Sequence, residues 1–509
     1  MIKAPEDGSK PISTTTRLRI TGIAMVIAAA LTTWAFGQKA EPSSGTRPAA
    51  ESKAAAAATA PAATSAAAST ASADPSVERG RYLAKAGDCI SCHTGPGAAP
   101  FAGGLPLKTP FGTIVSSNIT PDKSAGIGDY TEADFARALR EGVRRDGKHL
   151  YPAMPYPSFA KLGESDMHDL YAYFQQGVAS SATEPPPTDL PWPFSMRFLM
   201  MGWNVLYLDK GVYQAETSRS AEWNRGAYLV QGLGHCGECH TPRSMFGGVK
   251  ANSERKGDSY LAGALIDGWL AQPLRHMEQP TAAQWSTDDM VTYLKTGRTV
   301  HTAAFGPMSQ VVENSTQYMT KEDLGTIATY VRSIGAPAGM PAVAITPQLE
   351  IVAAAGKQPA TQQLRSGTLA GAGAMVYLNN CNACHRSSGA GADNAFPALA
   401  GNTVVNAKDP TSLIRIVLEG SARPGTVDSP SALAMPGFGW RLTDGNVADM
   451  LSFVRASWGN KAEAVTPAQV ATVRKTVSAA ALDATSPSPS ATPAPTPTPT
   501  PTPTRSTPK

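Results

Sequence analysis

Hydrophobic residues recur at helical spacing in three separate parts of the chain. In residues 131–142, TEADFARALREG, the side chains of Phe135, Ala138 and Leu139 fall on one helical face, and Thr131 can cap the N-terminus. Near residue 450, Val447, Leu451 and neighbouring apolar positions repeat at the same spacing. The predicted helices cover residues 131–142, Asp166–Phe174, Asp288–Thr296, Lys321–Ile334, Thr411–Glu419 and Gly445–Ser457.

Each pair of predicted helices follows a copy of one short sequence. The copies are GRYLAKAGDCISCHT from residue 80, GAYLVQGLGHCGECHT from residue 226 and AMVYLNNCNACHR from residue 374. Their first cysteines are Cys89, Cys236 and Cys381, so the copies are 236 − 89 = 147 and 381 − 236 = 145 residues apart. The pattern therefore predicts a mainly α-helical chain built from three copies of a small domain.

The cysteines indicate what these domains hold, because all six fall in C-x-x-C-H motifs. Two thiols one helical turn apart can bond to the vinyl groups of a porphyrin, and the following histidine can ligate its iron. A structural zinc site and a redox dithiol are the alternatives for paired cysteines. Zinc would not require the histidine three times, and a redox pair would not occur in triplicate. The sequence predicts three covalent haem c groups, bound by Cys89, Cys92, Cys236, Cys239, Cys381 and Cys384, with His93, His240 and His385 as proximal iron ligands.

Counting the histidines and methionines of the third domain predicts the second axial ligand of its iron, and the other two domains offer a methionine at the matching place. The third domain contains no histidine besides His385, and its methionines are Met375, Met435 and Met450. Met375 precedes the motif on the leading helix and Met450 takes a core position, which leaves Met435. Met154 and Met308 occupy the matching loops of the other domains, and each of the three lies beside a proline. Ordinary core packing is the competing explanation for any single methionine.

Some features stay open at this stage. His149 and His301 precede the proposed methionine ligands and are reserve candidates, whereas His168, His235 and His276 are weaker ones. Residues 190–208, LPWPFSMRFLMMGWNVLYL, are apolar and aromatic. They are either a connecting helix packed between domains or a surface for a partner subunit, a membrane or a quinone.

The chain ends differ in composition from the centre. Residues 20–37 carry no charge and follow a basic N-terminus, which favours an uncleaved membrane anchor over a cleaved signal ending near Ala35-Phe36-Gly37. Either would export the rest of the chain. The predicted organisation is a signal or anchor at 1–38, an Ala/Ser/Pro-rich linker at 39–75, haem domains at 76–185, 221–338 and 366–460, an apolar connector at 186–220, a linker at 339–365, and an extension with a disordered Pro/Thr tail at 461–509.

The amino-acid composition argues against several other classes of protein. Lys+Arg minus Asp+Glu is 44 − 40 = +4, so bulk charge gives no case for binding nucleic acid. Six cysteines in 509 residues exclude a disulfide-dense scaffold. If both axial positions of each iron are filled, the chemistry is electron transfer and not oxygen or peroxide turnover, which needs an open position.

From about residue 76 to residue 460 the chain resembles the three-haem cytochrome c subunit of bacterial membrane-bound alcohol, gluconate, sorbitol and aldehyde dehydrogenases. The matching stretches are FAGGLPLKTPFGTIVSSNITPD (101–122), AGIGDY (125–130), YPAMPYPSF (151–159), LGHCGECHTPRS (233–244), TAAFGPMSQVVENS (302–315) and MPGFGWRL (435–442). The resemblance implies three tandem class-I cytochrome c-like domains. It also supports the axial pairs His93/Met154, His240/Met308 and His385/Met435.

The resemblance further implies a function and its partners. Such a subunit takes electrons from a catalytic subunit carrying pyrroloquinoline quinone, flavin or molybdopterin, sometimes with a small third subunit. It passes them to ubiquinone or another respiratory acceptor, on the periplasmic side of the inner membrane. We expect no substrate-oxidising site in this chain. The alternatives are a freestanding multihaem electron shuttle and a multihaem peroxidase.

Overall fold

The computed structural model describes residues 74–277, 281–300, 302–335, 348–368 and 371–477, which belong to one compact unit, Thr70–Lys509. The predicted membrane segment at 20–37, residues 39–73 of the linker and the Pro/Thr tail at 485–509 lie outside the described residues. Within the described ranges, no helix combines the length and apolar character needed to cross a bilayer.

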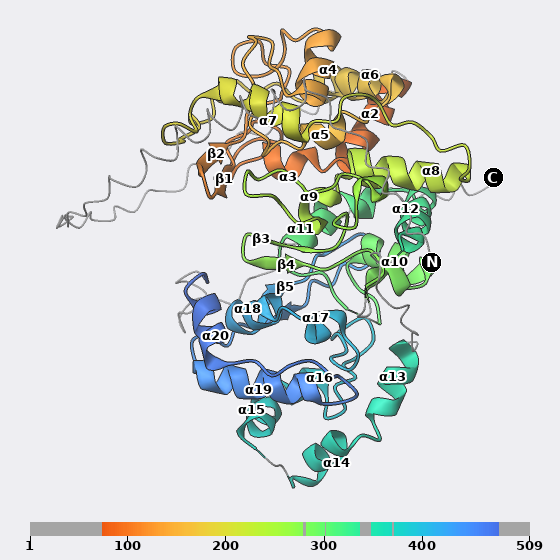
Figure 1. The fold of residues 1–509 in the computed structure, drawn as a ribbon, viewed down its shortest axis with the longest axis vertical. Helices are drawn as coiled ribbons and strands as arrows, with labels where there is room; N and C mark the ends of the chain where they lie inside the picture. The colour runs from red at the N-terminus through yellow and green to blue at the C-terminus, as the bar shows by residue number, and fades with distance from the viewer. Residues whose placement is uncertain (1–73, 278–280, 301, 336–347, 369–370, 478–509) are drawn as a thin grey trace, which may run out of the picture. The chain divides into compact units, whose positions relative to one another are not determined.

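The first segment of the chain, drawn from red to yellow in Figure 1, begins with a helix capped by the Asp74 side chain. Thr131 caps α4 as predicted, since its Oγ1 accepts from the Asp134 amide at 3.1 Å while the Asp134 carboxylate accepts from the Thr131 amide. The elements are α2 (Pro75–Ala86), α3 (Cys89–His93), β1 (Pro106–Thr109), β2 (Gly112–Val115), α4 (Glu132–Glu141), α5 (Tyr156–Phe159), α6 (Glu164–Ala172) and α7 (Met200–Tyr207).

The second segment repeats this order with its own antiparallel hairpin, in which Ala264 pairs with Ala271. Thr320 caps the last helix of this segment. The elements are α8 (Ala221–Tyr228), α9 (Gly237–His240), β3 (Ala264–Ile266), β4 (Trp269–Ala271), α10 (Thr287–Thr296), α11 (Pro307–Asn314) and α12 (Lys321–Ser333). Helices α10 and α12 match the predicted ranges to within a residue at each end.

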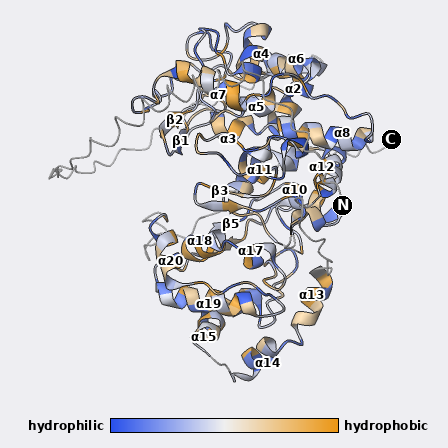
Figure 2. Ribbon diagram, viewed as in Figure 1, coloured by the Kyte–Doolittle hydropathy of each residue, from blue (hydrophilic) through white to orange (hydrophobic). Residues whose placement is uncertain are grey.

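The third segment contains helices that the sequence analysis did not anticipate, at both of its edges. Residues assigned there to a linker form α13 and α14, and residues assigned to the C-terminal extension form α20. The elements are α13 (Gln348–Ala355), α14 (Pro359–Ser366), α15 (Ala372–Asn380), α16 (Asn382–His385), α17 (Thr403–Asn406), α18 (Thr411–Glu419), β5 (Ser421–Ala422), β6 (Ala434–Met435), α19 (Asp444–Ala456) and α20 (Pro467–Arg474). Figure 2 shows hydrophobic and hydrophilic residues alternating along these helices, as amphipathic packing requires.

One helix crossing occurs three times, between α2 and α6, α8 and α12, and α15 and α19. At each crossing a glycine of the first helix lies against a backbone carbonyl of the second. A Cβ atom added at Gly80 would lie 1.9 Å from the Asp169 oxygen, and the corresponding distances are 1.9 Å from Gly226 to Thr326 and 2.1 Å from Gly373 to Asp449. Only glycine therefore permits this close approach.

The buried hydrophobic side chains form two cores. One core runs from Val77 to Ile334 and is shared by the first and second segments. The other runs from Ala355 to Val477 and belongs to the third segment, to which α20 contributes Val470 and Val473. The hairpin β3–β4 contacts α18, where the Leu270 amide donates to Ser412 Oγ at 2.7 Å.

Residues 190–208 form α7 and the irregular chain that precedes it. Asn204 attaches this helix to the first segment, because its side chain accepts from the Tyr156 hydroxyl at 2.6 Å and donates to the Glu141 carbonyl at 3.1 Å. Six large hydrophobic side chains of the stretch are exposed, namely Trp192, Phe194, Phe198, Met201, Val205 and Leu206. Trp203 and Tyr207 attach the helix to the second segment as well, through hydrogen bonds with the Phe246 carbonyl at 3.0 Å and the Ser244 hydroxyl at 2.8 Å. The stretch therefore connects the first two segments, as the first interpretation predicts, and its exposed apolar side chains leave the second interpretation, a surface for a partner, as a prediction.

Candidate haem-attachment sites

The three C-x-x-C-H motifs adopt the same local structure. Each forms a short helix that ends at its histidine, in α3, α9 and α16. In each motif the first cysteine is half-buried and the second is exposed. One helical turn thus separates the two thiols and leaves the second accessible, as thioether attachment to a porphyrin edge requires.

The three motif histidines are held in the same way. The Nδ1 atoms of His93 and His240 lie 2.7 Å from the carbonyl oxygens of Ser117 and Gln272, and Nδ1 of His385 lies 3.0 Å from that of Pro397. A carbonyl oxygen can only accept, so each Nδ1 carries the proton and each Nε2 keeps its lone pair for a metal. Burial lowers the pKa of all three imidazoles and so favours the neutral, ligating form.

The thiols do not have the properties of a redox pair. Burial raises the pKa of Cys89, Cys236 and Cys381, the half-buried first cysteine of each motif, to about 12. A catalytic dithiol needs a lowered thiol pKa, because the thiolate is its nucleophile. In the described part of the chain, no cluster of three or more His, Cys, Asp or Glu side chains that could hold a metal ion occurs. The donor set fits covalent haem.

The proposed methionine ligands all follow the first long helix after their motif, but their local structure differs, and Met308 lies inside α11 and not in the predicted loop. Met154 follows α4 in a tight turn, since its amide donates to the Tyr151 carbonyl at 3.2 Å and its carbonyl accepts from the Tyr156 amide at 2.8 Å. Both Met154 and Cys89 pack against the shared core. Met308 is half-buried in the first turn of α11, directly after Pro307.

Met435 lies in β6, opposite Ser421 of β5, and packs against the third-segment core together with Cys381. The other methionines of that segment are accounted for. Met450 is 2% exposed inside the core, as predicted, and Met375 is 46% exposed on α15. Met435 is thus the half-buried methionine of the third segment that is free to face a ligand.

The remaining histidines divide into paired and unpaired groups. His168 contacts Glu132 at 3.1 Å on the surface, and His276 contacts the Arg332 carbonyl at 3.1 Å. His235 lies 3.3 Å from the Gly87 carbonyl and stacks edge-on against Phe159, as a hydrogen-bonding neighbour of the motif would. His149 has a buried Nδ1 without a hydrogen-bond partner among the described residues, and it remains the reserve candidate. His301 lies outside the described residues.

Buried polar atoms without partners among the described residues occur beside two of the motifs and near Met435, and also at Arg137, Arg140, His149 and Tyr260. Within the described ranges they include Gln272 Nε2, beside the carbonyl that accepts from His240, and Asn380 Oδ1, beside Cys381. Others follow α18 on the way to Met435 or lie beside that loop: Ser421 Oγ, Arg423 Nη2, Thr426 Oγ1 and Arg298 Nε. Orphaned donors and acceptors of this kind fit a bound group that carries acids of its own, as haem does.

The first two motifs lie against one another. Ser91, inside the first motif, accepts from the Asn314 amide group of α11 at 2.9 Å, and the Ala86 carbonyl accepts from the Ser315 hydroxyl at 3.2 Å. Nε2 of His235, which directly precedes the second motif, lies 3.3 Å from the carbonyl oxygen of Gly87, two residues before the first motif. The first two candidate attachment sites are therefore neighbours.

These features define a c-type cytochrome. The family model for cytochrome c matches residues 77–177 and 370–458. The chain is 46% identical to the gluconate 2-dehydrogenase cytochrome c subunit of Pantoea cypripedii, over 79% of this chain and 90% of that one. It is also 46% identical to the cytochrome c subunit of the quinone alcohol dehydrogenase of Gluconobacter oxydans, over 76% and 79%, and 39% identical to the fructose dehydrogenase cytochrome subunit of Gluconobacter japonicus, over 79% and 83%. The chain belongs to this family of dehydrogenase cytochrome c subunits.

Proposed function

We propose that this chain carries three haem c groups and relays electrons, one at a time, from a catalytic dehydrogenase subunit to ubiquinone or another respiratory acceptor. The observation that carries the proposal is the threefold motif, with each histidine oriented by a backbone carbonyl. The identity to dehydrogenase cytochrome subunits over most of their length supports the assembly with a catalytic partner. A bound haem supplies the one-electron chemistry.

The proposed axial pairs are His93/Met154, His240/Met308 and His385/Met435. Filling both axial positions excludes oxygen and peroxide turnover, and a thioether ligand favours the reduced iron and so raises its potential. The contact between the first two motifs supports placement of two centres within reach of one another. The three haem domains of residues 76–185, 221–338 and 366–460, and an N-terminal anchor that holds them at the periplasmic face of the membrane, complete the proposal.

Co-purification tests the partner. From detergent-solubilised native membranes, the chain should elute with a catalytic subunit that carries quinone, flavin or molybdopterin, identified by mass spectrometry of the eluate. That cofactor would define the substrate class. A chain that elutes alone with three haems would instead identify a freestanding electron shuttle.

Replacing the proposed third ligand tests the assignment of Met435. In Met435→Ala, one haem of the three should lose its low-spin reduced spectrum, and its potential should fall by on the order of 100 mV because the thioether is lost. Spectroelectrochemical titration measures both. Met375→Ala is the matched control, since that side chain lies exposed on α15. Three unchanged low-spin haems in Met435→Ala would show that another residue ligates the third iron.

A further inference from the structure

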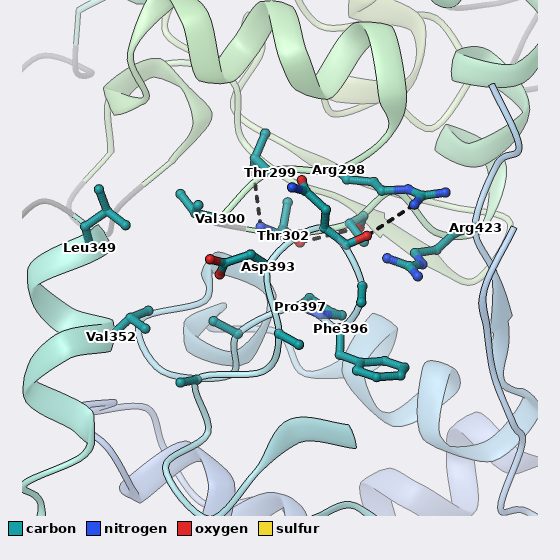
Figure 3. A pocket seen from close by; sticks show the side chains of 16 residues that line it. Arg298, Thr299, Val300, Thr302, Leu349, Val352, Asp393, Phe396, Pro397 and Arg423 are labelled. Atoms are coloured by element: carbon teal, nitrogen blue, oxygen red, sulfur yellow. Dashed lines mark hydrogen bonds between the residues drawn. The ribbon is translucent and has the colours of Figure 1, made fainter. Parts of the chain in front are cut away.

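A pocket beside the proposed third attachment site contains two arginines that have no carboxylate partner among the described residues. It is lined by the loop that follows α10, by the loop of residues 390–398 and by Arg423. Figure 3 shows the guanidinium groups of Arg298 and Arg423 on the same side of this pocket, while the carboxylate of Asp393 lies on the opposite side. The two arginines come from parts of the chain 125 residues apart.

Both arginines are buried, at 5% and 8% exposure for Arg298 and Arg423. Their hydrogen-bond partners among the described residues are backbone carbonyls. Arg298 donates to the carbonyls of Asn394 and Ser429 at 3.2 Å each and to that of Ser431, and Arg423 Nε donates to the Leu433 carbonyl at 3.2 Å. Arg298 Nε and Arg423 Nη2 have no partner among the described residues. Each guanidinium therefore keeps an unused donor in a buried position.

The positive charges of both guanidinium groups also lack an ion-pair partner among the described residues. Within the part of the chain that the structure describes, neither guanidinium lies within ion-pair distance of a carboxylate. Burial, and after it the charge of Arg298, lowers the pKa of Arg423 to about 10. Two buried like charges without a counter-ion are costly, and the cost is relieved when an anion accepts from both.

The position of the pocket indicates which anion this is. Pro397 lines the pocket, and its carbonyl orients His385, the proposed proximal ligand of the third iron. Arg423 lies in the loop between α18 and Met435, the proposed opposite ligand. Ser421 Oγ and Thr426 Oγ1, two further buried hydroxyls without partners among the described residues, belong to the same loop. The unused donors thus lie in segments that adjoin both proposed axial ligands of the third iron.

The first segment supplies a natural comparison. In all three segments a glycine with positive φ ends the helix before the methionine loop, at Gly142, Gly297 and Gly420, and an arginine follows within three residues. The first of these arginines, Arg144, is exposed and lies 3.4 Å from Asp146. Among these three arginines, burial without a carboxylate at ion-pair distance is therefore found for Arg298 and Arg423 and not for Arg144.

We propose that Arg298 and Arg423 together bind the propionate carboxylates of the haem attached at Cys381 and Cys384. Guanidinium–carboxylate hydrogen bonds are charge-assisted and can be bidentate, so the pair matches this ligand. Arg298 comes from the second segment, and a residue outside the third segment thereby sets the electrostatics of the third haem. The inference rests on the proposed attachment of that haem.

Redox titration of the full-length protein tests the proposal. Removing a nearby positive charge favours the oxidised, more positive haem. In Arg423→Gln and in Arg298→Gln, the reduction equilibrium constant of one haem should fall about tenfold, which is about 59 mV for a one-electron couple. Arg423→Lys, which keeps the charge, should give a smaller shift. The affected haem should be the one missing from a variant that lacks Cys381 and Cys384.

The controls separate this proposal from the haem assignment. Intact mass must first show three haems on the wild-type chain and on each variant. A wild-type chain without the third haem would refute the attachment itself. Arg144→Gln should leave all three potentials unchanged. Unchanged potentials in both glutamine variants, or a shift confined to another haem, would overturn the arginine pair.

A second readout covers glutamine variants that fail to fold. The propionate bending band in the resonance Raman spectrum responds to hydrogen bonds on the carboxylates. It should shift in Arg423→Lys and Arg298→Lys, because a lysine cannot reproduce bidentate contacts. The same band at an unchanged position in both lysine variants would also overturn the proposal.

Discussion

Replacing Cys381 and Cys384 together by alanine should leave two haems on the chain in place of three. The covalent links that the motif offers are thioether bonds from Cys381, the N-cap residue of α16, and from Cys384 within that helix. The third core should also lose stability, because Cys381 packs against it and His385 is buried beside it. Intact mass and the haem-to-protein ratio measure the loss directly.

The same double replacement in the other motifs gives an internal comparison. Changing Cys89 and Cys92, or Cys236 and Cys239, should each remove one haem as well. Ser387→Ala, two residues past the third motif, should keep all three. A Cys381/Cys384 variant that still carries three haems would mean that the motif is not an attachment site.

Gly226→Ala should destabilise the shared core far more than a small substitution normally does. The added methyl group would lie 1.9 Å from the Thr326 carbonyl oxygen, so α8 and α12 must separate. Overpacking of this kind costs about 3 kcal/mol of the free energy of unfolding, at the upper end of the usual range, because the obstacle is backbone and cannot rotate away. Denaturant unfolding followed by circular dichroism measures it.

Gly325→Ala is the matched control on the same helix pair. A Cβ atom there meets nothing within 4 Å, and alanine favours helix by about 1 kcal/mol over glycine. We expect this variant to be as stable as the wild type or more so. Equal stabilities of Gly226→Ala and wild type would show that the crossing is looser than the structure describes.

The sequence predicted the helices well where hydrophobic spacing and a cap coincide. Thr131 and the apolar face that follows it defined α4 to within a residue, and α18 was predicted with its observed bounds. The motif cysteines and histidines are proposed as haem ligands from local spacing alone, and this assignment stays a prediction. The exclusion of Met450 as a ligand also followed from helical periodicity.

Other parts of the site depend on contacts between distant residues. Nothing in the composition of Ser117, Gln272 or Pro397 reveals that their carbonyls orient the motif histidines, since any residue has a carbonyl. The Arg298–Arg423 pair was missed for a similar reason. The sequence did contain a signal, because an arginine follows a helix-ending glycine in EGVR, TGR and EGSAR, which end at Arg144, Arg298 and Arg423. Only the structure shows that the last two arginines are buried and the first is not.

The division of the hydrophobic side chains into two cores affects how the protein responds to damage. Val77 and Ile334 belong to one continuous core, so a defect in either the first or the second segment weakens both. The third segment has separate packing, with α20 closing its own core. We therefore expect the first two segments to unfold together and the third to unfold separately, although the sequence repeats three times, so that the first two proposed haem sites would be lost together.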